Sequence, residues 1–169
     1  MPAGKVGALG PAPSKLAITI DLEEYFQVEA MAGAVARDAW SGLPSRIEAS
    51  TERLLELYAA ADAHATFFVV GWVAERFPRM MARIATAGHE LGCHSYWHRP
   101  VFGLGRDEFR EDTRRAKAAI EDAAGAEVLG YRAPNFSIRS GMEWAWEELA
   151  EAGFRYDSSV HPIRHPFYG

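Results

Sequence analysis

Short apolar runs alternate with longer helical segments along most of this chain. Five runs are brief and rich in β-branched or aromatic residues, which predicts strands at 16–22, 65–70, 89–95, 127–131 and 154–157. The segments between them carry apolar residues at helical spacing, with helices expected near 47–62, 72–87, 106–124 and 141–152. Strand and helix in strict alternation favour an α/β fold with a parallel sheet or barrel and crossover helices.

Local signals mark where these helices begin and break. Ser45 with Glu48, and Ser140 with Glu143, have the spacing of capping boxes. Pro78 is expected to interrupt or restart the second helix. These signals set the expected helix boundaries.

Length and charge limit the class of protein. The 169 residues fit one domain, expected over 16–169 after a flexible Gly, Ala and Pro-rich segment at 1–15. The formal net charge of -5 argues against a nucleic-acid partner, because phosphate binding needs a basic surface. We expect no transmembrane segment, because no apolar run approaches the roughly 18 residues of a membrane span. The N-terminus lacks the apolar core of a signal peptide, so a cytoplasmic protein is expected.

Residues with useful chemistry follow several of the predicted strands. The carboxyl ends of parallel strands lie at one edge of a sheet or barrel, which is where active sites gather in such folds. The residues expected at that edge are Asp21, Glu23, His94, His98, Arg132 and Asp157.

His94 and His98 lie four residues apart, so a helical turn would place both imidazoles on one face, where they could chelate a metal ion. Ser95 stands where the zinc-protease helix needs its glutamate, which disfavours that motif. Two histidines in a loop can equally be solvated or held by hydrogen bonds. Cys93 could offer a thiolate, but a core position is favoured because adjacent strand residues point to opposite faces.

Asp21 and Glu23 are expected to point to the same side of the first strand, with Leu22 in the core. One carboxylate could bind a metal while the other acts as a general base. The alternative is a solvated acidic loop, and Glu24 fits that alternative best.

Two further polar groups follow the fourth and fifth strands. Arg132 could pair with Asp21, line a polar groove or form a surface ion pair. Asp157 could orient a catalytic partner or begin a turn. His161 and His165 lie among prolines and are interpreted as structural or solvated.

Taken together, these motifs resemble the polysaccharide deacetylase superfamily, carbohydrate esterase family four, over about 16–157. The matches are the acids after the first strand, the H-S-x-x-H motif, R-A-P followed by an aromatic, and an Asp near a strand end, together with 65–71 and 88–91. The amino-acid sequences of segments 21–29 and 131–134 are similar to those of the exosortase-linked (PEP-CTERM-associated) branch of the family. The sequence departs from the family pattern at two positions. The acidic metal ligand is Glu23, where the family usually has Asp. The aromatic residue of the third motif, Phe136, lies one position further along the chain than in the family.

The resemblance implies a distorted (β/α)7 barrel whose last strands, together with the histidine acting as general acid, are expected beyond Gly169. It makes Asp21 the base and assigns a divalent metal, expected to be Zn²⁺, to three ligands. The metal ligands are Glu23, His94 and His98. The catalytic residues include Arg132, Asp157 and Asn135, whose backbone N–H would bind the oxyanion. Aromatic walls for a sugar ring are expected from Tyr25, Phe26, Trp97 and Phe136.

The function implied is a metal-dependent hydrolase that removes N-acetyl groups from an amino-sugar polysaccharide, in exopolysaccharide biosynthesis or modification. Its partner would be an N-acetylated polysaccharide or oligosaccharide. Two alternatives stay open: an amidase acting on a small amide or cyclic imide, and a non-catalytic carbohydrate-binding relic.

Overall fold

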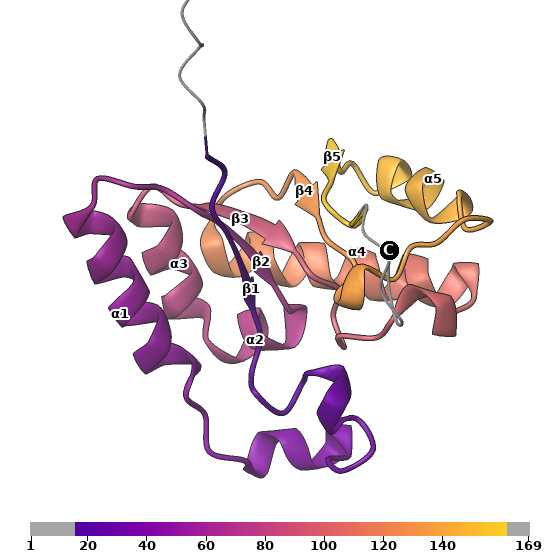
Figure 1. Cartoon of the computed structure of the whole chain (residues 1–169), viewed down its shortest axis with the longest axis horizontal. Coiled ribbons are helices and arrows are strands. Elements are labelled where there is room, and N and C mark those ends of the chain that lie inside the picture. The colour runs from indigo at the N-terminus through magenta and orange to yellow at the C-terminus, as the bar shows by residue number, and fades with distance from the viewer. Residues whose placement is uncertain (1–15, 162–169) are drawn as a thin grey trace, which may run out of the picture.

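A five-stranded sheet forms the centre of the protein in the computed structural model, which describes residues 16–161 (Figure 1). All neighbouring strands are parallel, and their order in the sheet is their order in the sequence. The strands are β1 (Thr19–Leu22), β2 (Thr66–Val69), β3 (Glu90–Cys93), β4 (Gly130–Tyr131) and β5 (Tyr156–Asp157). All five predicted strands are confirmed, each shorter than its apolar run. The segment 1–15 and His165 lie outside the described residues.

Helices connect the strands as the alternating pattern predicts. They are α1 (Ile47–Ala60), α2 (Gly71–Arg76), α3 (Pro78–Thr86), α4 (Arg106–Ala124) and α5 (Trp144–Glu151). Short 3₁₀ helices lie at Glu29–Met31, Arg37–Gly42, Val101–Gly103 and Pro134–Phe136. The expected break at Pro78 is confirmed, because Phe77 leaves the helical conformation and Pro78 opens α3.

Both predicted capping boxes are wrong. α1 begins at Ile47, and the Ser45 hydroxyl donates a hydrogen bond to Glu24. α5 begins at Trp144, after Glu143, whose carboxylate accepts a hydrogen bond from the Gly141 N–H at 3.0 Å. Ser45 Oγ still accepts the Ile47 N–H at 3.4 Å, so Ser45 contacts the first turn of α1 without forming the predicted capping box.

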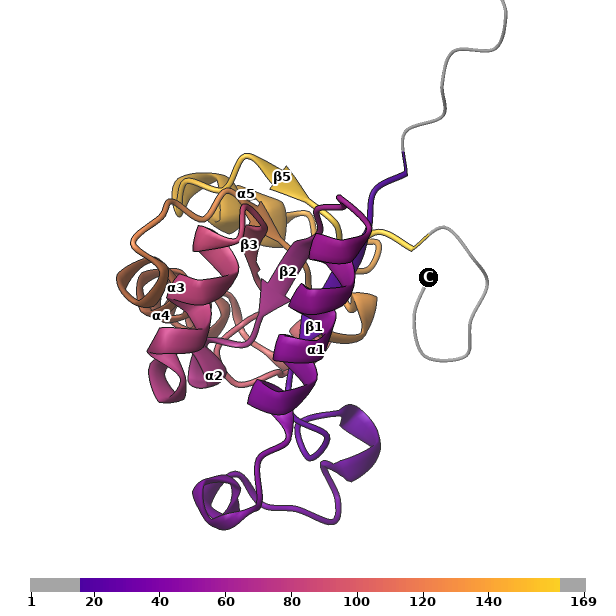
Figure 2. The same cartoon turned by 90° about the vertical axis from the view of Figure 1, so that its left-hand side faces the viewer.

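The two faces of the sheet differ in character. One face contributes alternate residues such as Phe67, Val69 and Cys93 to the apolar core beneath the helices. On the other face Asp21, Phe68 and Gly92 lie side by side in register. Figure 2 shows α3 and α4 together on one side of the strands. Residues 16–161 form an open sheet with β1 and β5 at its edges, so the parallel α/β prediction is confirmed while barrel closure stays a prediction.

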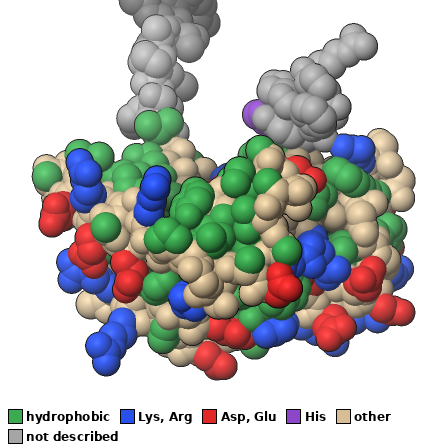
Figure 3. All heavy atoms as spheres, turned by 90° about the horizontal axis from the view of Figure 1, so that it is seen from below, with side chains coloured by type: hydrophobic (Ala, Val, Ile, Leu, Met, Phe, Trp, Pro, Cys, Tyr) green, Lys and Arg blue, Asp and Glu red, His purple; other side chains and the backbone are tan. Residues whose placement is uncertain are grey.

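Charges of both signs are mixed over the face of the molecule in Figure 3, where no continuous basic area is visible. Within residues 16–161, no helix has both the length and the apolar character that crossing a membrane requires.

Candidate metal centre

The ends of β1 and β3 bring three potential metal ligands together. Leu22, Val69 and Cys93 are aligned across β1, β2 and β3, so the chain leaves β1 and β3 at the same level of the sheet. Beyond these ends, one donor atom from each of three side chains lies within 4.8 Å of the other two: Glu23, His94 and His98. These are the same three residues that the family resemblance implies as metal ligands.

His94 is held in a defined orientation by the backbone after β4. Its Nδ1 lies 2.7 Å from the carbonyl oxygen of Arg132, which accepts a hydrogen bond when Nδ1 carries the proton. This tautomer, assigned from that partner, leaves the Nε2 lone pair available. Burial lowers the pKa of His94, although the Asp21 carboxylate acts in the opposite direction. A neutral imidazole is the form that binds metal ions.

The contact between Glu23 and His98 fits a shared cation. Glu23 Oε2 and His98 Nε2 lie 2.6 Å apart. Glu23 Oε2 is nevertheless buried without accepting a hydrogen bond, so its proximity to the ring does not satisfy it. A buried carboxylate oxygen without a donor is unfavourable unless a cation or water meets it. The donor set, two imidazoles and a carboxylate, therefore suits a divalent metal ion.

The segment from His94 to His98 does not form the helical turn that would place both imidazoles on one helix face. Ser95 and His98 both adopt left-handed backbone conformations, with φ of 59° and 52°. The two imidazoles still approach, with ring centroids 5.1 Å apart. Left-handed non-glycine residues are unfavourable and are often found at functional sites.

Asp21 lies beside this cluster and is held by Arg132. An Arg132 NH1–Asp21 Oδ1 bond of 2.8 Å confirms the predicted ion pair, and Arg132 NH2 also donates to the Ser158 hydroxyl at 2.8 Å. The Asp21 side chain keeps 31% of its surface exposed, so it remains open to a bound molecule. Arg132 thus orients Asp21 through its side chain and His94 through its carbonyl oxygen.

Phe68 packs against Arg132 on the sheet face that carries Asp21, Phe68 and Gly92. The guanidinium carbon of Arg132 lies 4.2 Å from the centre of the Phe68 ring. The ring can lie over β3 because Gly92 has no side chain: a Cβ there would be 2.6 Å from the ring. Phe68 and Gly92 were not identified from the sequence as site residues, since their role depends on cross-strand register.

Changing Gly92 to alanine is therefore expected to disturb the site from beneath. The added methyl group would displace Phe68, and with it Arg132 and Asp21, lowering both turnover and the free energy of unfolding, the latter by about 1–3 kcal/mol. Denaturant unfolding and steady-state kinetics measure the two effects. Gly103→Ala is the matched control, because a Cβ at Gly103 meets nothing within 4 Å. Equal behaviour of the two variants would contradict the proposed support.

Asp157 and the loop after β4 are tied together. Asp157 accepts hydrogen bonds from Trp146 Nε1 at 3.2 Å and from the backbone and hydroxyl of Ser159 at 3.0 and 2.5 Å. The Ser159 hydroxyl in turn accepts the Ala133 N–H at 2.8 Å. Asp157 thus has the turn geometry that was one of its two predicted roles, and its catalytic role stays a prediction.

The same loop carries Asn135 and Phe136, both with positive φ. Oxyanion binding by the Asn135 N–H stays a prediction. Phe136 is half-buried and stacks on His161 at 4.9 Å between ring centroids. His161 therefore has a packing role, as expected.

The other predicted aromatic walls differ in exposure. Tyr25 is exposed and Trp97 is half-buried, so both offer surface to a ligand. Phe26 is only 2% exposed and packs against Trp40 and Trp72. It therefore shapes a cavity wall and is poorly placed for stacking on a sugar.

The expectation that Glu24 lies in a solvated acidic loop is wrong. Glu24 is 2% exposed, not solvated, and accepts hydrogen bonds from the Ser45 hydroxyl and, at 3.4 Å, from the Arg46 N–H. Cys93 is buried in the core as expected, and burial raises the pKa of its thiol, which disfavours the thiolate.

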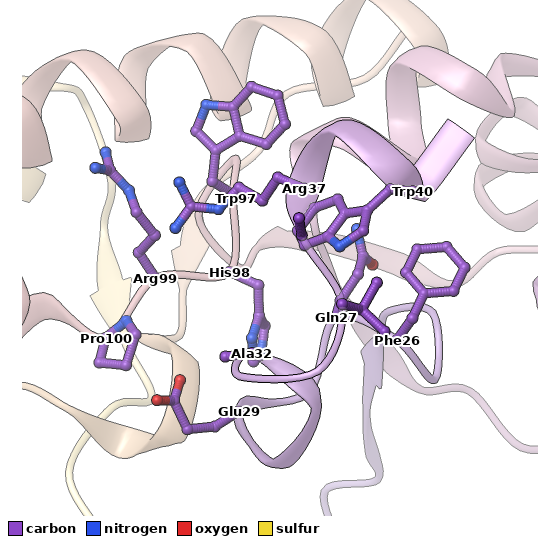
Figure 4. A pocket seen from close by; sticks show the side chains of 12 residues that line it. Phe26, Gln27, Glu29, Ala32, Arg37, Trp40, Trp97, His98, Arg99 and Pro100 are labelled. Carbon is purple, nitrogen blue, oxygen red and sulfur yellow. The ribbon is translucent and has the colours of Figure 1, made fainter. Parts of the chain in front are cut away.

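A pocket of about 450 Å³ opens beside His98 (Figure 4). Its lining comes from the segment after β1, the 3₁₀ helix Arg37–Gly42 and the residues that follow Tyr96. The polar and aromatic residues of this lining include Gln27, Glu29, Arg37, Trp40, Trp97 and Arg99. Of these, only Trp97 was identified from the sequence as a site residue, although Gln27 and Glu29 lie within the 21–29 segment that carries part of the family resemblance.

Comparison with known proteins gives a consistent picture. A model of the polysaccharide deacetylase family matches residues 38–156. The peptidoglycan deacetylase of Helicobacter pylori is 31% identical over 122 residues, covering 72% of this chain and 41% of that protein. The peptidoglycan-N-acetylglucosamine deacetylase of Bacillus cereus is 31% identical over 99 residues, covering 58% of this chain and 36% of that protein.

A crystal structure supports the same relationship. It is of a Mycobacterium smegmatis protein provisionally named a polysaccharide deacetylase, 30% identical with a TM-score of 0.70. The match covers 88% of this chain and 52% of that one. The matched part of this chain thus corresponds to about half or less of each of these relatives.

Proposed function

The chain belongs to the polysaccharide deacetylase family, a family of hydrolases acting on carbon–nitrogen bonds, and from that premise we propose that it removes N-acetyl groups from an amino-sugar polysaccharide. One observation carries the proposal: three metal donors lie within 4.8 Å of one another, beside a carboxylate held by Arg132. The substrate proposed is an exopolysaccharide of the kind that the exosortase-linked resemblance implies. The two curated relatives are named for action on peptidoglycan, another amino-sugar polymer.

The metal would be held by Glu23, His94 and His98. Two imidazoles and one carboxylate leave a position open, an arrangement typical of catalytic zinc, and zinc is the ion we propose. When bound, such an ion lowers the pKa of a coordinated water and polarises the carbonyl of the acetyl group.

The chain's own residues supply the remaining roles. Asp21 is exposed enough to meet a water molecule, and it accepts the proton as general base while Arg132 keeps its carboxylate in place. The Arg132 carbonyl keeps the His94 ring oriented for its role. The backbone N–H of Asn135 binds the oxygen on which negative charge develops.

The proposal is tested by acetate release from an N-acetylglucosamine oligosaccharide by the zinc-loaded full-length protein. We expect release that stops on chelation and returns on adding zinc. Cyclic imides and small amides form a parallel panel. Turnover of those compounds alone would favour the amidase alternative, whereas stoichiometric zinc with turnover of neither class would favour a binding protein.

A further inference from the structure

The pocket beside His98 contains several hydrogen-bond donors that the described protein leaves unused. Trp40 and Gln27 are each only 4% exposed, yet Trp40 Nε1 and Gln27 Nε2 are buried without a hydrogen-bond partner. The Gln27 amide orientation is fixed, because its Oε1 accepts the Glu24 N–H at 2.8 Å. Arg99 Nε is also buried without a partner. Buried donors are normally satisfied, so such a concentration points to an acceptor-rich ligand.

Two guanidinium groups add positive charge to the same pocket. Arg37 makes no hydrogen bond or ion pair with residues 16–161, and Arg99 makes only long contacts of 3.5 Å with Glu108 and Asp112. Burial lowers the pKa of Arg37, and the nearby charge of Arg99 lowers it further, while the Asp112 carboxylate acts in the opposite direction. Two like charges held close together are relieved by an anion between or beside them.

The remaining lining suits a sugar. Trp97 contributes a half-buried indole to the lining that also holds Arg37 and Arg99; in Figure 4 the Arg37 guanidinium lies below the indole and the Arg99 guanidinium to its left. Glu29, the acidic residue of the lining, is drawn away from these two groups in the same view. His98 belongs both to this pocket and to the metal centre, so a ring bound here would be a neighbour of the sugar whose acetyl group is cleaved.

We propose that this pocket is a subsite for a carboxylate-bearing sugar, whose carboxylate is held by Arg37 and Arg99. Planar guanidinium groups match carboxylates through paired hydrogen bonds and are more weakly hydrated than ammonium groups. Trp40 Nε1 and Gln27 Nε2 donate to the remaining oxygens of the ring or carboxylate. The substrate would then be an acidic polymer in which N-acetylated and carboxylate-bearing sugars are neighbours. This inference rests on the proposed deacetylase function.

The test compares a neutral N-acetylglucosamine oligosaccharide with one in which N-acetylglucosamine alternates with glucuronic acid. We expect a higher kcat/KM for the acidic oligosaccharide. Arg37→Gln should reduce the ratio of the two values roughly tenfold to a hundredfold, the range of a hydrogen bond to a charged group. Arg83→Gln removes the same charge from an exposed arginine paired with Glu52, and it should leave the ratio unchanged.

Direct binding separates this inference from the proposed function. Calorimetry with the Asp21→Asn chain measures affinity for the acidic oligosaccharide without turnover, and free glucuronate as competitor shows whether the carboxylate alone suffices. Arginine-dependent binding to this variant, together with no hydrolysis by the zinc-loaded protein that retains Asp21, would support the subsite and contradict the deacetylase. Hydrolysis of the neutral oligosaccharide, with no preference for the acidic one and no effect of Arg37→Gln on the ratio, would overturn the subsite alone.

Discussion

Replacing both His94 and His98 by alanine is expected to leave the protein without bound zinc and without acetate release. The double variant loses two of the three donors that lie within 4.8 Å of one another, and Glu23 alone cannot hold the ion. Even groups that only orient a ligand contribute roughly 10–100-fold in affinity, so the loss should exceed that range. Elemental analysis of the purified proteins measures the metal directly.

His64→Ala is the matched control for this experiment. His64 is exposed and packs on His89, at the opposite end of β3 from the metal centre. The control should retain about one equivalent of zinc, as expected for a single site. Full zinc occupancy in the double variant would show that the assigned centre is wrong.

Asp21→Asn is expected to keep the metal and lose turnover. The amide preserves the size of the side chain but cannot accept a proton, so kcat should fall by about 10²–10⁴-fold, the usual contribution of a general base. Glu23→Gln should instead weaken metal binding, because it removes a charged ligand. Zinc affinity and kcat, measured separately for the two variants, distinguish the roles.

Glu24→Gln makes the same chemical change one residue further along. Its side chain faces Ser45 and Arg46, so we expect metal affinity and kcat to remain near those of the unmodified protein. Exchanged outcomes for Asp21 and Glu23 would mean that base and ligand have been confused. Loss of zinc in Glu24→Gln would mean that the ligand had been placed one residue too early.

Much of this fold could be predicted because its strands are short, apolar and separated by strongly periodic helices. α4 begins and ends where the pattern predicts, at Arg106–Ala124. The capping boxes failed because local spacing cannot show that Ser45 has a competing partner in Glu24, far away in the sequence. Strand lengths failed because pairing depends on the neighbouring strand as well as on the apolar run.

The site shows the same division between local and tertiary information. Alternation along β1 correctly placed Leu22 in the core, with Asp21 and Glu23 on either side of it less buried, since strand geometry fixes that pattern. The left-handed conformations at Ser95 and His98 could not be predicted, because neither residue type requires them. Gln27 and Arg37 were not predicted as site residues for a related reason. The pocket that they line is formed by a loop and a 3₁₀ helix, and neither produces a periodic pattern of apolar residues in the sequence.

Because of the position of β1 in the sheet, metal binding at the proposed centre would also stabilise the fold. In the sheet that residues 16–161 form, β1 is an edge strand bonded only to β2, and such strands are prone to local opening. Glu23 follows β1, whereas His94 and His98 follow β3. An ion bound by all three would therefore connect β1 to β3 across β2. Binding to the folded state alone stabilises it by about 2.7 kcal/mol at a hundredfold excess over Kd. Zinc bound at the proposed centre would thus raise the free energy of unfolding of the protein as well as support its turnover.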